Sequence, residues 1–144
     1  MDAMQSFTKL RVWQAAYRLT MDIYRVTRSF PPEERYGLTA QVCSSAVSVM
    51  SNIAEASASR WPADFSRILN NAEKEAAETL SHLFVARGLS YLDSPTAQDL
   101  IARTLHIRRM LYRLQEKVKA HVAHRARRTA PPEPRSPSGP KTEN

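Results

Sequence analysis

With 144 residues, of which 42% are hydrophobic and 24% charged, the chain is typical of one globular domain with a buried core, and it carries a net charge of +7. A lone cysteine, Cys43, excludes an internal disulfide, and four histidines without a cysteine cluster do not indicate a zinc site. No run approaches the roughly 18 apolar residues that span a bilayer, and no basic segment leads into an apolar N-terminal stretch. We therefore expect a cytoplasmic protein that holds no metal or cofactor and does not enter a membrane.

Prolines divide the chain into long segments that favour helix. Ser94-Pro95 and Trp61-Pro62 are typical of helix starts, because proline is tolerated in the first turn and disruptive further on. The last stretch is rich in Pro, Arg and Ser and nearly free of apolar residues, which indicates disorder. The predicted helices cover about residues 7–30, 34–59, 62–91 and 95–124, forming a domain over 1–125 followed by a disordered tail over 126–144.

Each predicted helix carries apolar residues at alternating steps of three and four, as Val12, Ala16 and Leu19 illustrate. The third segment extends its pattern to Leu89 and Leu92 near its end. Such narrow seams suit helices that pack nearly parallel, at a crossing of about 20°. With short connections, the sequence predicts an all-α, antiparallel up-down-up-down four-helix bundle.

A second apolar stripe accompanies the seam of the first helix. It contains Leu10, Trp13 and Tyr17, and it reaches Tyr24 after Thr20. Aromatic residues at these steps either complete the core or form an interface between copies of the chain. Trp13, Tyr17 and Tyr24 are therefore candidate residues of an oligomer interface.

The positive charge is confined to one end of the chain. Residues 1–102 hold ten Lys/Arg and eleven Asp/Glu, a net charge of −1, whereas residues 103–144 hold eleven against three, a net charge of +8. In the fourth helix, one stripe of residues lies roughly opposite the seam, and cations on it are suited to phosphate groups. The stripe comprises His106, Arg109, Arg113 and Lys117, and His124 and Arg128 extend it if the helix continues. The candidate nucleic-acid-binding residues are Arg109, Arg113, Lys117, Arg125, Arg127 and Arg128.

Other polar residues favour structure over chemistry. Asn52 and Glu55 lie beside the seam of the second helix, where we expect them to satisfy backbone groups at a helix end or to cross-link helices. Cys43 also lies beside that seam and is expected to pack as a small residue. No histidine has an arginine at the upstream spacing of the HEPN ribonucleases, and no Glu-x-x-His pair of the ferritin type occurs. The sequence therefore predicts no catalytic residues and no enzyme.

Three segments carry a resemblance to a known family. Val12-Trp13-Gln14 in the first helix and Asn52-Ile53-Ala54-Glu55 in the second resemble the four-helix bundle proteins encoded in 23S rRNA intervening sequences, as does Glu34-Arg35-Tyr36-Gly37-Leu38. The resemblance covers residues 7–92 in detail. It implies an up-down-up-down bundle that assembles as a homo-oligomer, often a pentamer. The family is also distantly similar to the accessory proteins of diversity-generating retroelements, and this similarity implies RNA or DNA as a partner.

The chain departs from that family where the family has basic residues. Cys43 and Ser44 stand where two arginines are usual, and Glu73-Lys74-Glu75 replaces an Arg-Gly-Ser segment. The sequence therefore leaves two hypotheses. One is a non-enzymatic homo-oligomer that binds nucleic acid or a ribonucleoprotein through the fourth helix and the tail. The other is a protein–protein adaptor that uses the acidic third helix and the aromatic stripe.

Overall fold

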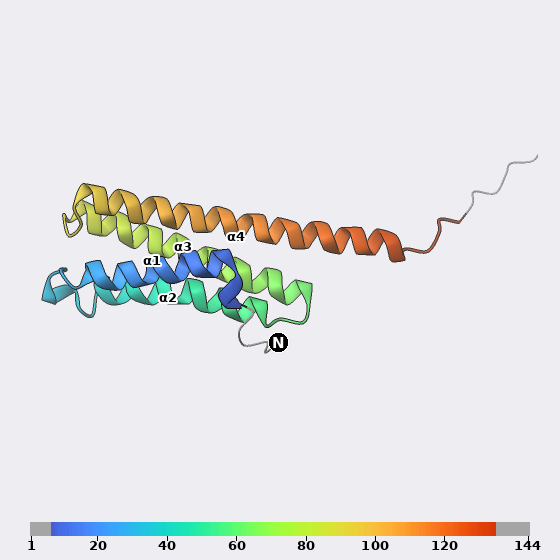
Figure 1. The fold of residues 1–144 in the computed structure, drawn as a ribbon, viewed down its shortest axis with the longest axis horizontal. Helices are drawn as coiled ribbons and strands as arrows, with labels where there is room; N and C mark the ends of the chain where they lie inside the picture. Colours follow the sequence, from blue (N-terminus) through green and yellow to red (C-terminus); the bar gives the residue numbers. More distant parts are fainter. Residues whose placement is uncertain (1–6, 135–144) are drawn as a thin grey trace, which may run out of the picture.

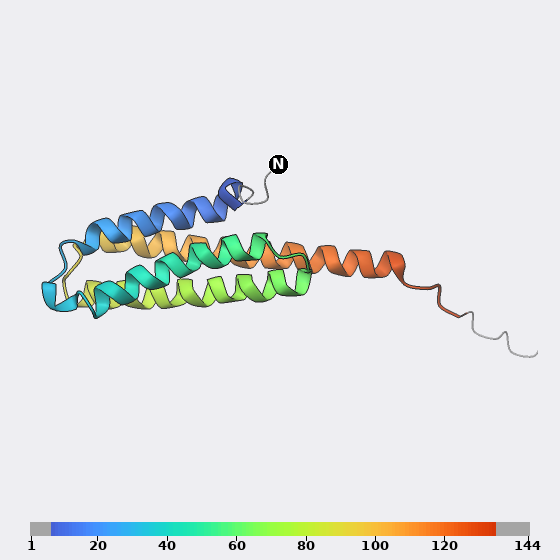
Figure 2. The ribbon, with the colours of Figure 1, turned by 90° about the horizontal axis from the view of Figure 1, so that it is seen from below.

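The computed structural model describes residues 7–134, and its helices confirm the predicted all-α class. The elements are η2 (Phe7–Lys9), α1 (Arg11–Thr27), η3 (Pro32–Glu34), α2 (Leu38–Ser57), α3 (Pro62–Gly88) and α4 (Ser94–Thr129), where η denotes a short 3-10 helix. Successive helices run in opposite directions and are joined at the ends of the bundle (Figures 1 and 2). The chain thus forms the predicted up-down-up-down four-helix bundle.

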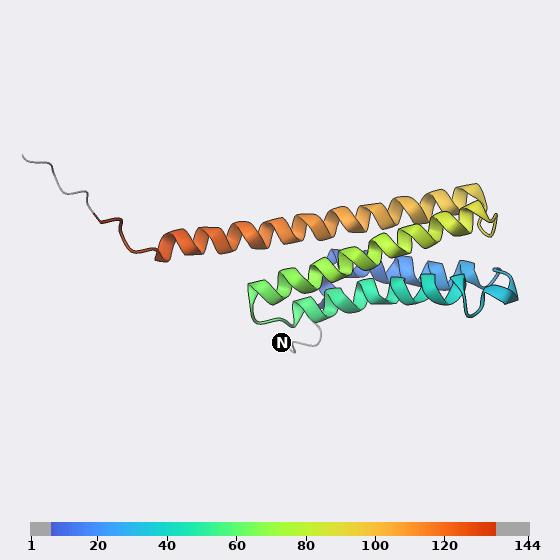
Figure 3. The same cartoon turned by 180° about the vertical axis from the view of Figure 1, so that it is seen from behind.

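The helices contact one another in a ring. Each helix packs on the next in the chain, and α1 closes the ring by packing on α4 (Figure 3). The centre of the ring is filled by apolar side chains from all four helices, most of them at the predicted seam positions. The largest fully buried apolar side chains are Ile23, Val42, Ile53, Leu69, Leu83, Leu100, Ile107 and Leu111.

The first two helices begin later than predicted, because other local structure occupies the expected first turns. Leu10 is extended and separates η2 from α1, so α1 begins at Arg11. Before α2, the Glu34 side chain accepts a hydrogen bond from the backbone N–H of Leu38 at 2.8 Å. This bond satisfies an N–H group that has no partner within the helix, and α2 begins at Leu38.

The third helix ends at Gly88, three residues before its predicted end. Ser90 adopts a left-handed backbone conformation with φ of 61°. The N–H of Ser90 donates to the carbonyl of Arg87, and the N–H of Tyr91 donates to the carbonyl of Ala86, which is the Schellman pattern of a helix C-terminus. Because the chain turns here, Leu89 is 52% exposed and the prediction that it extends the seam is wrong.

The fourth helix is longer than predicted. It continues to Thr129, so residues 126–129 are helical and do not belong to the tail that was predicted to begin at 126. Alanine and arginine favour helix, and no Gly or Pro interrupts the segment between Pro95 and Pro131. Residues 130–134 have no regular secondary structure, and the rest of the predicted tail lies outside the described residues.

Two threonines supply polar contacts inside the core. The Thr20 hydroxyl, which the sequence placed within the aromatic stripe, is buried and lies 3.2 Å from the carbonyl of Ala46, linking α1 to α2. The Thr79 hydroxyl donates to the Ser45 hydroxyl at 2.8 Å, linking α2 to α3. Both threonines can also bond to carbonyls of their own helices, so these buried hydroxyls have partners.

Candidate nucleic-acid interface

The start of α4 is fixed by a side-chain cap. The carboxylate of Asp93 accepts a hydrogen bond from the N–H of Thr96 at 2.8 Å, and Pro95 occupies the first turn, where its missing N–H does no harm. The hydrogen bonds from Thr96 lower the pKa of Asp93, because they favour the charged carboxylate. From this capped start, α4 runs for 36 residues, or about 54 Å.

The predicted stripe of α4 is exposed along its whole length. Its members recur at steps of three, four and seven, so they share one side of the helix. Among the described residues, none of the arginines and lysines in the stripe forms an ion pair with an acidic side chain. We call this set the α4 basic row: His106, Arg109, Arg113, Lys117, His124 and Arg128.

The last turns of α4 project beyond the rest of the bundle (Figure 1). Every described residue from Lys119 onward is exposed. Arg125 lies five turns after the buried Ile107 and therefore points to the same side of α4, yet Arg125 is exposed. With Arg127 and Arg128, it makes this end of α4 basic on several sides, so the predicted arginines are brought together on a helix rather than in a tail.

The beginning of the α4 basic row lies next to α1, a neighbour that the sequence did not predict. His106 and Arg18 line the same groove, together with Ala15, Ala102, Arg103 and Ile107. We call this the α1–α4 groove. The first member of the row therefore borders α1, and the other members lie further along the exposed side of α4. The seven-residue spacing of Arg11, Arg18 and Arg25 is the signal by which the sequence could have revealed a basic side of α1.

The predicted oligomer residues share one side of α1. Tyr24 lines a groove with residues of α2, and Tyr17 lines a groove with Arg18 and with Asp99 and Arg103 of α4. Trp13 is half-buried, stacks on Tyr17 with ring centroids 5.4 Å apart, and meets Phe7 edge-on at 5.2 Å. Tyr17 is 43% exposed and Tyr24 is 46% exposed. We call Trp13, Tyr17 and Tyr24 the aromatic flank. Its rings contribute only part of their area to the core of one chain.

The polar pair of α2 does not join one helix to another. The Asn52 side chain donates to the Ser48 carbonyl at 2.8 Å within the same helix. Glu55 is exposed, and its backbone carbonyl accepts a hydrogen bond from the Ser59 hydroxyl at 3.4 Å near the end of α2. The Asn52 side chain thus bonds within its own helix and not at a helix end, whereas the Glu55 side chain remains at the surface.

The remaining reactive side chains are arranged for packing. Cys43 is buried, and its burial raises the pKa of its thiol, which disfavours the nucleophilic thiolate. On α3, burial and the charge of Glu78 raise the pKa of Glu75. Within residues 7–134, no three His, Cys, Asp or Glu side chains lie close enough together to hold a metal ion, and no helix there is long and apolar enough to cross a membrane.

The fold and the arrangement of basic residues define an all-helical bundle protein whose cationic surface lies on its last helix. Residues 8–113 match the model of the family described as 23S rRNA-intervening sequence protein, and the chain belongs to this family. The fold is similar to that of a protein of unknown function from the S23 ribosomal protein family of Bacteroides thetaiotaomicron, with a TM-score of 0.66, 23% identity, and coverage of 72% of this chain and 97% of that chain. No curated protein matches the sequence.

Proposed function

We propose that this chain binds nucleic acid through the α4 basic row and the end of α4, and that it does so without catalysing a reaction. The observation that carries the proposal is the set of exposed cations on α4, among which Arg109, Arg113 and Lys117 have no acidic partner among the described residues. Lys and Arg bind phosphates by charge and by N–H donors, and such contacts do not depend on base sequence. Membership of a family named for 23S rRNA intervening sequences agrees with an RNA partner.

The electrostatic mechanism predicts binding that weakens steeply with salt. For a fluorescent single-stranded RNA of about 20 nucleotides, the logarithm of the binding constant is expected to fall linearly with the logarithm of salt concentration, by about 0.7 for each phosphate neutralised. Fluorescence anisotropy of the full chain over a salt series measures this slope. Binding that is absent at low salt would refute the proposal, and capture of a defined protein partner after nuclease treatment would then favour the adaptor hypothesis.

The acidic surface that the adaptor hypothesis needs is partly used within the bundle. The side chain of Gln115 on α4 donates to the Glu73 carboxylate on α3 at 2.7 Å. Glu73 is half-buried, and its carboxylate is thus engaged with a neighbouring helix of the same chain. This contact leaves fewer acidic groups of α3 for a protein partner, which is why the nucleic-acid hypothesis is preferred.

We further propose that the chain forms a homo-oligomer, such as the pentamer implied by the resemblance, through the aromatic flank. Aromatic residues are enriched at protein interfaces, where each ring buries a large area. Tyr17 and Tyr24 each leave more than two-fifths of their surface exposed on one side of α1. A second copy packed on this flank would remove that surface from water.

Charge introduced into the aromatic flank is expected to separate the subunits. The double variant Tyr17→Asp/Tyr24→Asp should elute with the mass of one chain in size-exclusion chromatography with light scattering, because two carboxylates would otherwise be buried without partners. Tyr36→Asp is the matched control, since Tyr36 is 88% exposed and lies outside the flank. If the double variant and the control keep the same mass as the unmodified protein, the flank is not the interface.

A further inference from the structure

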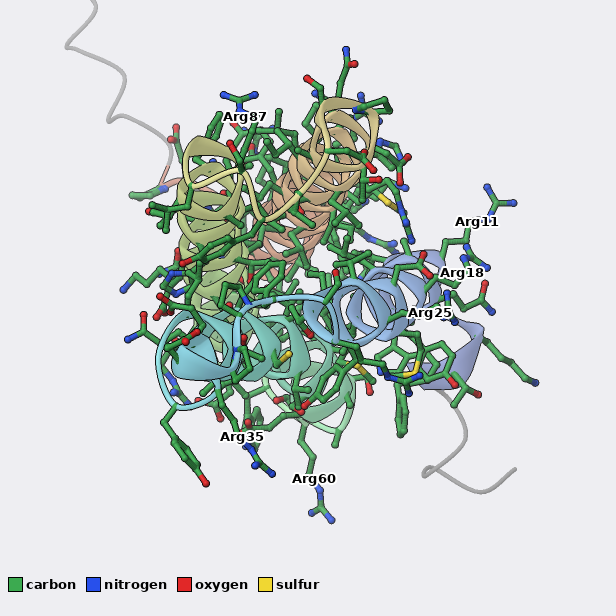
Figure 4. The ribbon with its side chains drawn as sticks, turned by 90° about the vertical axis from the view of Figure 1, so that its left-hand side faces the viewer. Arg11, Arg18, Arg25, Arg35, Arg60 and Arg87 are labelled. Carbon is green, nitrogen blue, oxygen red and sulfur yellow. The ribbon has the colours of Figure 1, made fainter. Side chains whose placement is uncertain are left out.

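A second basic row runs along α1. Arg11, Arg18 and Arg25 are spaced by seven residues, close to two helical turns, and all three are exposed. Their side chains leave α1 on the same side of the bundle, whereas Arg35 and Arg60 lie beyond α2 and Arg87 lies beside α3 (Figure 4). The α1 row is therefore separate from Arg35, Arg60 and Arg87.

This row borders the α1–α4 groove. Arg18 and His106 both line the groove, which places them on its two sides. Because α1 and α4 are antiparallel, a step of seven residues back from Arg18 to Arg11 corresponds to a step of seven forward from His106 to Arg113. Arg11 and Arg113 are thus at about the same level along the two helices, about two turns beyond Arg18 and His106.

Acidic residues neutralise only one end of the groove. Asp22 pairs with Arg25 and also accepts from Arg103 at 2.7 Å, and Asp99 lies 3.3 Å from Arg103. Toward the projecting end of α4, Arg11, Arg18, Arg109 and Arg113 have no acidic partner within residues 7–134. The arginines of the two rows are therefore unpaired from Arg18 toward the projecting end of α4, where Glu116 pairs instead with Lys119 at 3.5 Å.

We propose that the α1–α4 groove holds one phosphodiester backbone of the bound nucleic acid between Arg11 and Arg18 on one side and the α4 basic row on the other. This inference rests on the proposed function and adds α1 to its binding surface. Axes of packed helices lie about 8–10 Å apart, so long arginine side chains from both can reach one backbone, whereas a whole duplex is too wide to enter. Each guanidinium offers several N–H donors to phosphate oxygens.

The test compares the two rows in the full-length chain. Arg11→Ala/Arg18→Ala is expected to weaken binding of a single-stranded RNA by about 20-fold at about 0.1 M salt, and to reduce the salt slope by about 1.4, because two phosphate contacts are lost. Arg11→Lys/Arg18→Lys should restore most of the affinity, since it keeps both charges. The matched control is Arg35→Ala/Arg60→Ala, which removes the same charge from the α2 side and should change affinity less than twofold (Figure 4).

The outcomes separate this inference from the proposed function. If variants of the α4 row weaken binding and the α1 variant does not, the proposed binding in the α1–α4 groove is refuted and binding by α4 stands. If no row affects binding, both fail. If the control weakens binding as much as the α1 variant, net charge explains the effect and the groove is again refuted. Competition by duplex RNA shows whether the bound backbone comes from a single strand or from one strand of a duplex.

Photo-crosslinking locates the backbone independently of charge. Ala102 lines the α1–α4 groove and Ala40 lines a groove between α1 and α2, and both are exposed. Ala102→Cys and Ala40→Cys can each carry a photoreactive azidophenacyl group, because the buried Cys43 is protected from the reagent. RNA is expected to crosslink through position 102 and not through position 40. Equal crosslinking at the two positions would overturn the groove.

Discussion

Replacing Arg109, Arg113 and Lys117 by glutamate is expected to weaken binding of a single-stranded RNA by about 100-fold or more at about 0.1 M salt. Three exposed cations of the α4 basic row would be lost, and three carboxylates would then repel the phosphates. When the logarithm of the binding constant is plotted against the logarithm of salt concentration, the slope should become shallower by about 2. This change corresponds to the loss of three phosphate contacts on a single strand. Anisotropy titrations over a salt series measure both quantities.

A matched charge reversal separates the α4 row from net charge. Arg60, Arg67 and Lys74 are exposed residues in and before α3, and their replacement by glutamate changes the charge of the chain by the same amount. This control should lose much less affinity, because only long-range attraction is reduced. Equal losses in the two variants, or no loss with the α4 variant, would contradict a binding site on α4. Circular dichroism should show both variants helical, since all six positions are exposed.

Leu111→Ala is expected to reduce the free energy of unfolding by about 2–5 kcal/mol. Leu111 is fully buried where α4 faces the core, so removal of its side chain leaves a cavity that the surrounding helices fill only in part. Small domains are stable by only about 5–15 kcal/mol, and the loss is therefore a large fraction of the total. Urea unfolding followed by circular dichroism measures the change from the shift in midpoint at constant slope.

Val122→Ala provides the comparison on the same helix. Val122 is 41% exposed near the projecting end of α4, and its truncation should change the free energy of unfolding by less than about 0.5 kcal/mol. The two variants together test whether α4 is anchored by its first half. Similar destabilisation by both would mean that the end of α4 is packed, for example against another copy of the chain.

The fold followed from the sequence because its signals were local and agreed with one another. Steps of three and four residues placed Val12, Ala16 and Leu19 in the core, and all three are buried. The helix ends were less accurate because they depend on single hydrogen bonds. The turn at Ser90 exposes Leu89, and the contact from the Glu34 side chain moves the start of α2 to Leu38. Nothing in helix periodicity encodes such contacts.

The candidate site was predictable along one helix and not between helices. The spacing of Arg109, Arg113 and Lys117 predicted one exposed side of α4, and the structure places them there. That Arg18 would stand across a groove from His106 depends on how α1 packs against α4, a register to which Asp22 and Arg103 contribute an ion pair. Pairing between positions so distant in the chain leaves no pattern within either segment.

The projecting end of α4 links binding to the order of the helix itself. Like charges one turn apart destabilise a helix by a few tenths of a kcal/mol per pair, and beyond Lys119 no buried side chain offsets this repulsion. The last turns should therefore fray more readily than the buried half of α4. A bound polyanion neutralises the repelling charges, so it stabilises these turns as it binds. The affinity of the chain for its ligand then includes the free energy of ordering its own last turns.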